Sequence, residues 1–171
     1  MSDPKAKLLQ LATEVESLYT EMSTESNLYQ ARNKIYCPSK CSNCCKSPTV
    51  SATPLEMLPL AFHLINSNQV PTDWSKDSCI FHHNGCSKYL YRPTVCRLFG
   101  WAQVSGKTAN RLSVCPTTIK NNELSPDAPN IELWASKVRS LEPSLGTEIL
   151  PINQALKLMV EKILLYQRFD E

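Results

Sequence analysis

The chain has 171 residues, of which 42% are hydrophobic and 20% are charged, an ordinary composition for a globular protein. A domain of this length can bury roughly 70% of the surface that its unfolded chain exposes, so a core need not depend on metal or disulfides alone. Lysine and arginine number 18 against 16 aspartate and glutamate residues, and no long basic run is present. This balance argues against nucleic acid as a partner.

The first eighteen residues mix charged with apolar side chains, so they lack the uninterrupted apolar core of a secretory signal. No stretch of the sequence approaches the ~20 apolar residues that cross a bilayer. We therefore expect a cytoplasmic protein with no membrane partner, and a compartment in which thiols are kept reduced.

Amphipathic helices are predicted near both ends of the chain, because apolar residues recur there at spacings of three and four. The first helix is predicted over residues 5–22, and residues 27–35 extend the helical region. The last is predicted over residues 151–168. Its simplest use is to pack against the first.

The middle of the chain is predicted to hold two shorter helices and a β-hairpin. Thr53-Pro54-Leu55-Glu56 can form a capping box, and Asn130 can cap a helix over residues 130–140. Residues 70–78 are predicted to form a loop. The segments 98–104 and 110–114 flank a Ser-Gly-Lys turn, which predicts a hairpin that brings Cys96 and Cys115 together.

These elements predict a mainly α fold, in which one helical domain over residues 1–171 carries cysteine-rich loops and a small β-hairpin. Residues 37–115 would form the cysteine-rich core of this domain. Residues 1–36 and 116–171 would supply the flanking helices.

Eight cysteines are the most distinctive feature of the sequence, and four of them fall within nine residues in a C-x3-C-x2-C-C run. Soft thiolate ligands select zinc, copper(I) or iron–sulfur clusters. We therefore predict a metal–thiolate centre. Its candidate ligands are Cys37, Cys41, Cys44, Cys45, Cys79, Cys86, Cys96 and Cys115.

The dense run allows more than one local geometry. Cys41 and Cys44 form a C-x2-C pair that a turn can direct at one ion, whereas a helix beginning at Pro38 would place Cys37 on the same face as both. Successive side chains diverge by about 100° in a helix. We therefore expect Cys44 and Cys45 to serve different places, although a multinuclear cluster relaxes that conflict. Eight thiolates could supply two four-cysteine sites, or one cluster with four remaining thiols.

Other readings of the same residues stay open. An even number of cysteines permits about 105 disulfide pairings, a reading that the missing secretory signal disfavours. Cys79, Cys86, Cys96 and Cys115 could instead be small buried hydrophobic residues. The adjacent His82 and His83 could supply imidazole ligands, or could lie in a solvent-facing loop.

The segment 86–99 combines a C-x2-Y sequence with R-P-x2-C-R. It follows the cysteine run at 37–45 and the T-P-x-E helix start, and a closing cysteine completes the order. Through this order over residues 37–115, the chain resembles the YkgJ-type CxxCxxCC family, which is named as a zinc- or iron-chelating domain. A similar cysteine motif occurs in flagellin lysine methylases, where it is associated with a 4Fe–4S cluster. The resemblance therefore favours an iron–sulfur cluster over zinc.

The chain departs from the family pattern at the start of the cysteine run. Three residues rather than two separate Cys37 from Cys41, and Ser42 and Asn43 stand where a glycine is often found. This leaves Cys37 as the least secure ligand.

Three further side chains are predicted to contact the cofactor. Several thiolates make a centre anionic, and the guanidinium groups of Arg92 and Arg97 can offset that charge. Tyr89 could pack against the centre or donate to a sulfur. Surface ion pairing for the arginines and core packing for the tyrosine are the alternatives.

The sequence thus favours a metal-binding protein that holds an iron–sulfur cluster, with zinc at one or two four-cysteine sites as the alternative. A component of a methyl-transfer enzyme is a second class, although no parallel βα repeat follows the cysteine run as a radical S-adenosylmethionine barrel would require. Thiol–disulfide chemistry at Cys44 and Cys45 is a third. The expected partner is a metal ion or cluster, and a protein partner is left open.

Overall fold

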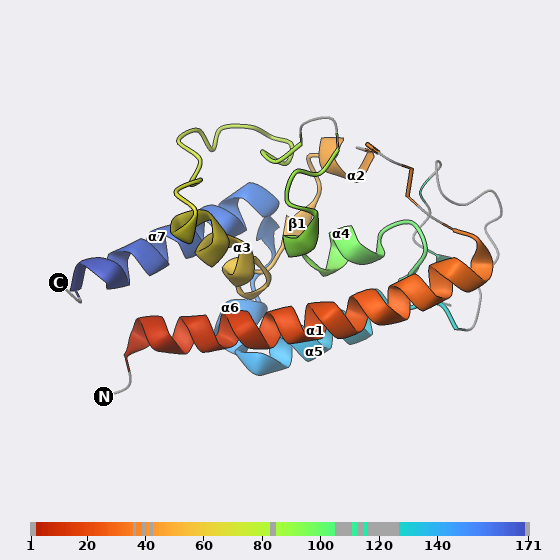
Figure 1. Cartoon of the computed structure of the whole chain (residues 1–171), viewed down its shortest axis with the longest axis horizontal. Coiled ribbons are helices and arrows are strands. Elements are labelled where there is room, and N and C mark those ends of the chain that lie inside the picture. Colours follow the sequence, from red (N-terminus) through yellow and green to blue (C-terminus); the bar gives the residue numbers. More distant parts are fainter. Residues whose placement is uncertain are drawn as a thin grey trace.

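The fold is mainly α, as predicted, and the computed structural model contains seven α-helices and four two-residue strands within its described residues (Figure 1). The described residues are 3–35, 37–38, 40–41, 43–82, 85–104, 111–112, 115 and 127–169. None of the helices in these ranges combines the length and hydrophobicity that a membrane-spanning segment requires.

The first helix, α1, spans Pro4–Asn33 and forms the long straight edge of the molecule in Figure 1. The Asp3 carboxylate caps its start by accepting from the Lys5 backbone N–H at 2.8 Å. Lys34 ends it in the left-handed conformation, with φ of 53°. The helix predicted over residues 5–22 and its extension toward residue 35 are therefore one element.

The helix α3 spans Pro54–Asn66 and lies at the centre of the apolar core. Its predicted capping box is confirmed, because the Thr53 hydroxyl accepts from the Glu56 N–H while the Glu56 carboxylate accepts from the Thr53 N–H. Leu55, Leu58 and Ala61 are fully buried in this helix.

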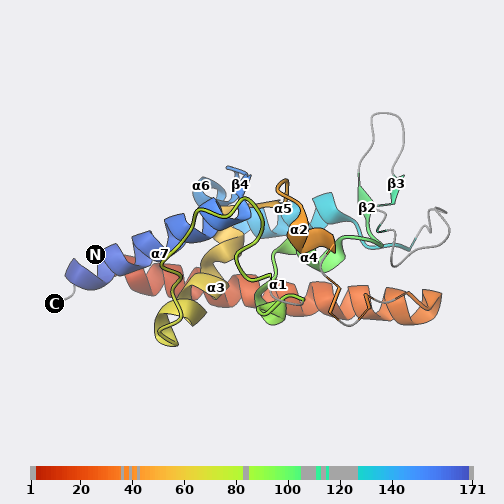
Figure 2. The ribbon, with the colours of Figure 1, turned by 90° about the horizontal axis from the view of Figure 1, so that it is seen from above.

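Two more predicted helices are confirmed in the second half of the chain. The helix α5 spans Ile131–Leu141 behind its Asn130 cap, and α7 spans Ile152–Phe169. Between them lies the short helix α6, Pro143–Gly146. The helix α7 touches α1, but it packs mainly against α3, which lies between the two (Figures 1 and 2). The prediction that the last helix packs on the first is therefore correct only in part.

Two antiparallel strand pairs complete the fold. The strands β1, Ser51–Ala52, and β4, Leu150–Pro151, pair with Ser51 opposite Pro151, and so join the start of α3 to the start of α7. The strands β2, Gln103–Val104, and β3, Arg111–Leu112, form the predicted hairpin. Its intervening residues, 105–110, lie outside the described part of the chain.

The predicted strand over residues 98–104 is too long. The helix α4 occupies Thr94–Leu98, and the backbone turns before β2 begins. Pro93 precedes the first residue of α4 with its φ fixed at −67°, which favours starting a helix there. The second short helical element in this region is the 3₁₀ turn η1, Tyr89–Tyr91.

Candidate metal centre

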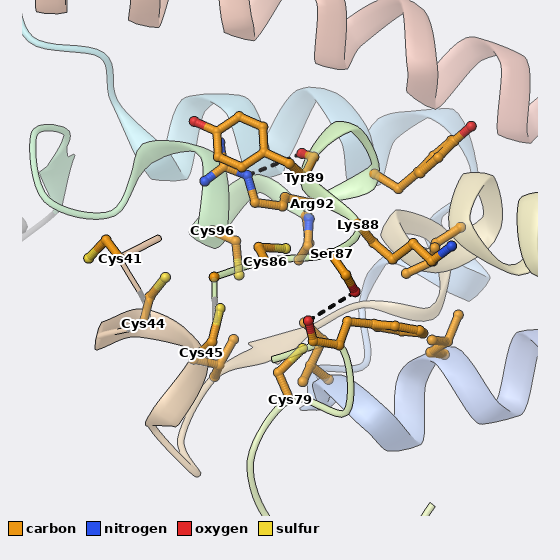
Figure 3. A pocket seen from close by; sticks show the side chains of 18 of the residues that line it. Cys41, Cys44, Cys45, Cys79, Cys86, Ser87, Lys88, Tyr89, Arg92 and Cys96 are labelled. Atoms are coloured by element: carbon orange, nitrogen blue, oxygen red, sulfur yellow. Dashed lines mark hydrogen bonds between the residues drawn. The ribbon is translucent and has the colours of Figure 1, made fainter. Parts of the chain in front are cut away.

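Three parts of the chain bring their cysteines to one cavity of about 390 Å³ (Figure 3). The first part is α2, which spans Asn43–Lys46, together with the segment that leads into it. The second is the loop after residue 78, and the third is α4. In Figure 3 the side chains of Cys44, Cys45 and Cys96 point into one shared space. Seven of the eight cysteines line this cavity: Cys37, Cys41, Cys44, Cys45, Cys79, Cys86 and Cys96.

The adjacent thiols of Cys44 and Cys45 both line the cavity, and Cys45 forms hydrogen bonds with Cys44 and with Cys86. The expectation that these neighbours serve different places stays a prediction, although both thiols border the same cavity. Cys45 bridges two sulfurs that are 42 positions apart in the chain.

The hydrogen bonds from Cys45 lower the pKa of Cys44 to about 6, and lower that of Cys86 to about 6 as well. The same contacts raise the pKa of Cys45, because each neighbouring sulfur is a better acceptor when it is ionised. The contacts with Cys45 thus favour the thiolate forms of Cys44 and Cys86. Thiolates are the form that binds metal, so this group is prepared for soft-metal ligation.

Arg92 is the cation that faces the sulfurs. Its positive charge favours the ionised forms of Cys44 and Cys86, adding to the effect of Cys45 on their pKa. At Cys96 and Cys37 burial outweighs the same charge, and the pKa of both thiols is raised. Its Nε donates to the Tyr89 carbonyl at 3.2 Å, and its guanidinium lies 3.4 Å from the centre of the Tyr89 ring. Arg92 and Tyr89 both line the cavity, where the guanidinium can offset the charge of a thiolate centre.

Arg97 is buried and bonds to residues around the thiol site rather than lining the cavity itself. Its Nε donates to the Arg92 carbonyl at 2.6 Å, its Nη2 donates to the Leu90 carbonyl, and its Nη1 donates to the Ser23 hydroxyl of α1 at 2.8 Å. The guanidinium also lies 4.2 Å from the centre of the Tyr19 ring. Arg97 is not among the residues that line the cavity. It ties the backbone of Arg92 to α1.

Burial disfavours the ionised form of three other cysteines. It raises the pKa of Cys96, and that of Cys79. Cys37 packs against a small apolar cluster that includes Trp101, and burial together with the neighbouring Cys41 raises its pKa to about 11. Metal binding at these three positions requires the release of a proton.

Glu56 connects the centre of the core to the helix that carries Cys96. Its carboxylate is buried and accepts from the Thr94 backbone N–H at 3.0 Å, in addition to its bonds within the capping box. The first turn of α4 is thereby fixed to the first turn of α3. One carboxylate positions two helix starts, and with them the Cys96 thiol.

Asn153 holds the loop of Cys79 in the same way, a role that no sequence pattern indicates. Its Nδ2 donates to the carbonyls of Lys76 and Ser78 at 2.8 and 2.9 Å, and its Oδ1 accepts from the Ile80 N–H at 3.2 Å. Asn153 is 7% exposed and lines the cavity from the first turn of α7. Only the pairing of segments more than 70 positions apart reveals its role, which no local pattern encodes.

A glycine permits the close approach of two cysteine-bearing segments. Gly85 has φ of +113°, and a Cβ there would lie 3.2 Å from the Lys40 Cα. Residues with side chains rarely adopt that backbone conformation. Gly85 therefore lets the backbone next to Cys86 reach the backbone next to Cys41.

Two sets of predicted residues lie apart from the cavity lining. Cys115 is buried, at 4% exposure, but is not among the residues that border the cavity with Cys96. His82 forms an isolated bridge with the backbone of Cys86 and is likewise absent from the lining, and His83 lies outside the described residues. Among the described side chains, no group of three or more histidines, cysteines, aspartates and glutamates is arranged to hold an ion. The sulfurs border a shared space.

Comparison with known proteins agrees with this geometry. Residues 36–118 match the CxxCxxCC family, which is described as a proposed zinc- or iron-chelating domain. The matched segment contains all eight cysteines. No curated protein and no solved structure matches the chain.

Proposed function

We propose that the chain is a metal-binding protein whose cysteine thiolates hold an iron–sulfur cluster of the 4Fe–4S type. The observation that carries this proposal is the gathering of seven cysteines around one cavity, beside the Arg92 guanidinium. The match of residues 36–118 to a zinc- or iron-chelating family supports a metal as the ligand.

The resemblance of the cysteine run to the motif of flagellin lysine methylases, which is associated with a 4Fe–4S cluster, favours a cluster over one zinc ion. A 4Fe–4S cluster and a structural zinc ion each take four thiolate ligands, so either would leave three of the seven cysteines that line the cavity as neighbours rather than ligands. Further cysteines and a cation beside the ligands would then tune the charge and potential of the cluster.

Zinc at one or two four-cysteine sites is the alternative, because the family description covers both metals. The two differ in colour and in sulfide content. The protein should be purified without oxygen, and its visible spectrum, iron, acid-labile sulfide and zinc should be measured per chain. Brown protein with iron and sulfide supports the cluster, whereas colourless protein that holds zinc and takes up no iron on anaerobic reconstitution overturns it.

Single substitutions then identify the ligands. We expect Cys44→Ala and Cys86→Ala to reduce the bound metal strongly, because contact with Cys45 lowers the pKa of these two thiols and both line the cavity. Cys115→Ala is the matched control, since Cys115 is buried outside the cavity lining. Metal content that falls equally in all three variants would show that the loss reflects folding rather than ligation.

A further inference from the structure

The cavity extends beyond the thiols into an apolar compartment. Its wall is supplied by α3 and α7, which pack against each other and are the best-buried part of the molecule. The aromatic rings of Phe81 and Tyr91 border the same space. The aliphatic residues of this wall are Val50, Met57, Leu60, Ile152 and Leu156.

The aliphatic wall offers no ligand for a metal. An apolar shell can exclude water from a thiolate centre, but it supplies that centre with neither sulfur ligands nor N–H donors. The cavity as a whole, at about 390 Å³, falls within the range of small-molecule sites, which are mostly apolar with a few polar groups that fix orientation. The wall therefore has the character of an organic ligand site that adjoins the sulfurs.

Lys88 places a positive charge at the apolar end of the cavity. In Figure 3 its side chain extends away from the cysteines, whereas Arg92 lies above them. The Lys88 Nζ lies 3.3 Å from the His63 Nε2 and donates to the Gln69 side-chain carbonyl, contacts that hold it at the rim. None of the described residues that line the cavity is an aspartate or glutamate. A ligand with a negative group at this end would meet a cation and no opposing carboxylate.

We propose that this compartment binds a small organic acid with an apolar, aromatic body, whose carboxylate pairs with Lys88 while its body lies against α3 and α7. The ligand would sit beside the thiols, where a metal centre could act on it. The compartment is formed by apolar helices, so the inference does not depend on which metal the thiols hold.

The test compares two probes that differ in charge. Fluorine NMR titrations of anaerobically purified protein would measure the dissociation constants of para-trifluoromethyl-phenylacetate and of its uncharged carboxamide. We expect both to bind and the acid to bind about fivefold more tightly, which is the upper end of what a partly exposed ion pair contributes. Lys88→Met should abolish this difference, and Lys88→Glu should reverse it. Lys40→Met, at the thiol end of the cavity, should leave it unchanged.

A second variant tests the apolar wall. Val50→Phe adds volume at the edge of the compartment and should weaken both probes, whereas Leu158→Phe adds the same ring at an exposed position of α7 and should weaken neither. Equal affinities for the two probes, or a charge preference that persists in Lys88→Met, would overturn the proposal. The metal content of the same samples shows separately whether the thiol site has been lost.

Discussion

Arg92 is the residue whose charge links the thiols to the rest of the cavity. Its guanidinium favours the ionised forms of the nearby thiols, including Cys44 and Cys86, and stacks on Tyr89. We expect Arg92→Met to weaken metal retention by about tenfold, the lower end of the effect of a lost partner beside metal ligands. Arg92→Lys keeps the charge but loses the planar stacking, so its effect should be smaller. Competition with a chelator measures both.

A surface arginine provides the control for this effect. Arg32 forms an exposed ion pair with Asp127, 2.9 Å away, and Arg32→Met changes the net charge of the protein by the same amount. We expect it to retain metal like the unmodified protein. Equal loss in Arg32→Met and Arg92→Met would mean that net charge, rather than the position of Arg92, sets the affinity.

At the level of elements, the joint start of α3 and α4 depends on one buried carboxylate. Glu56→Ala removes the capping box and leaves the Thr94 N–H without its acceptor. Bonds to a charged group contribute about 1.5–3 kcal/mol, so we expect a loss of about 2–4 kcal/mol in the free energy of unfolding. Glu56→Gln keeps one acceptor oxygen and should cost less. Urea unfolding of metal-free protein measures the change.

The exposed Glu161 of α7 offers a matched control for Glu56. Its carboxylate lies 3.8 Å from the Lys157 ammonium, one helical turn earlier. Glu161→Ala should change the free energy of unfolding by less than about 0.5 kcal/mol, as expected for an exposed pair in a helix. If Glu56→Ala costs no more than Glu161→Ala, the carboxylate does not hold the two helix starts.

The elements that could be predicted are those whose sequence signals lie within a short stretch of the chain. The Thr53 capping box and the apolar periodicity of α1 and α7 lie within a few turns of chain, so short-range patterns reveal them. The pairing of β1 with β4 joins two residues to two others about 100 positions away. Strands that short carry no periodic signal. The start of α4 at Thr94 was missed for a similar reason, since its fixing acceptor is Glu56.

The candidate site divides in the same way. Cysteine spacing revealed which residues could bind metal, but it could not show that Cys44 and Cys45 border one cavity, because segments far apart in the chain enclose that cavity. The role of Asn153 and the apolar wall of the cavity come from the packing of α7 against α3. Both features depend on tertiary packing, which local sequence patterns do not reveal.

At the level of the whole molecule, the apolar core and the cysteine-bearing segments differ in what stabilises them. The helices α1, α3 and α7 share one large buried cluster. The loop of Cys79 joins this cluster through Cys79 and Ile80, and is otherwise held by hydrogen bonds that include the Cys79 N–H to the Cys45 carbonyl at 3.3 Å and the contacts of Asn153. Metal binding would stabilise the loop more than the core, because a short irregular segment buries less apolar surface than the packed helices and opens more easily.

Metal removal should accordingly loosen the cysteine segments and leave the helical core folded. A protein of this size loses about 2–4 °C in Tm for each kcal/mol of lost stabilisation, so chelation should lower Tm. We expect the helical circular dichroism at room temperature to stay nearly unchanged. In hydrogen exchange, amides of residues 76–82 should exchange faster without metal, while those of α3 and α7 keep their protection. Collapse of the helical signal on chelation would instead mean that the metal is required to fold the core, as in small zinc domains.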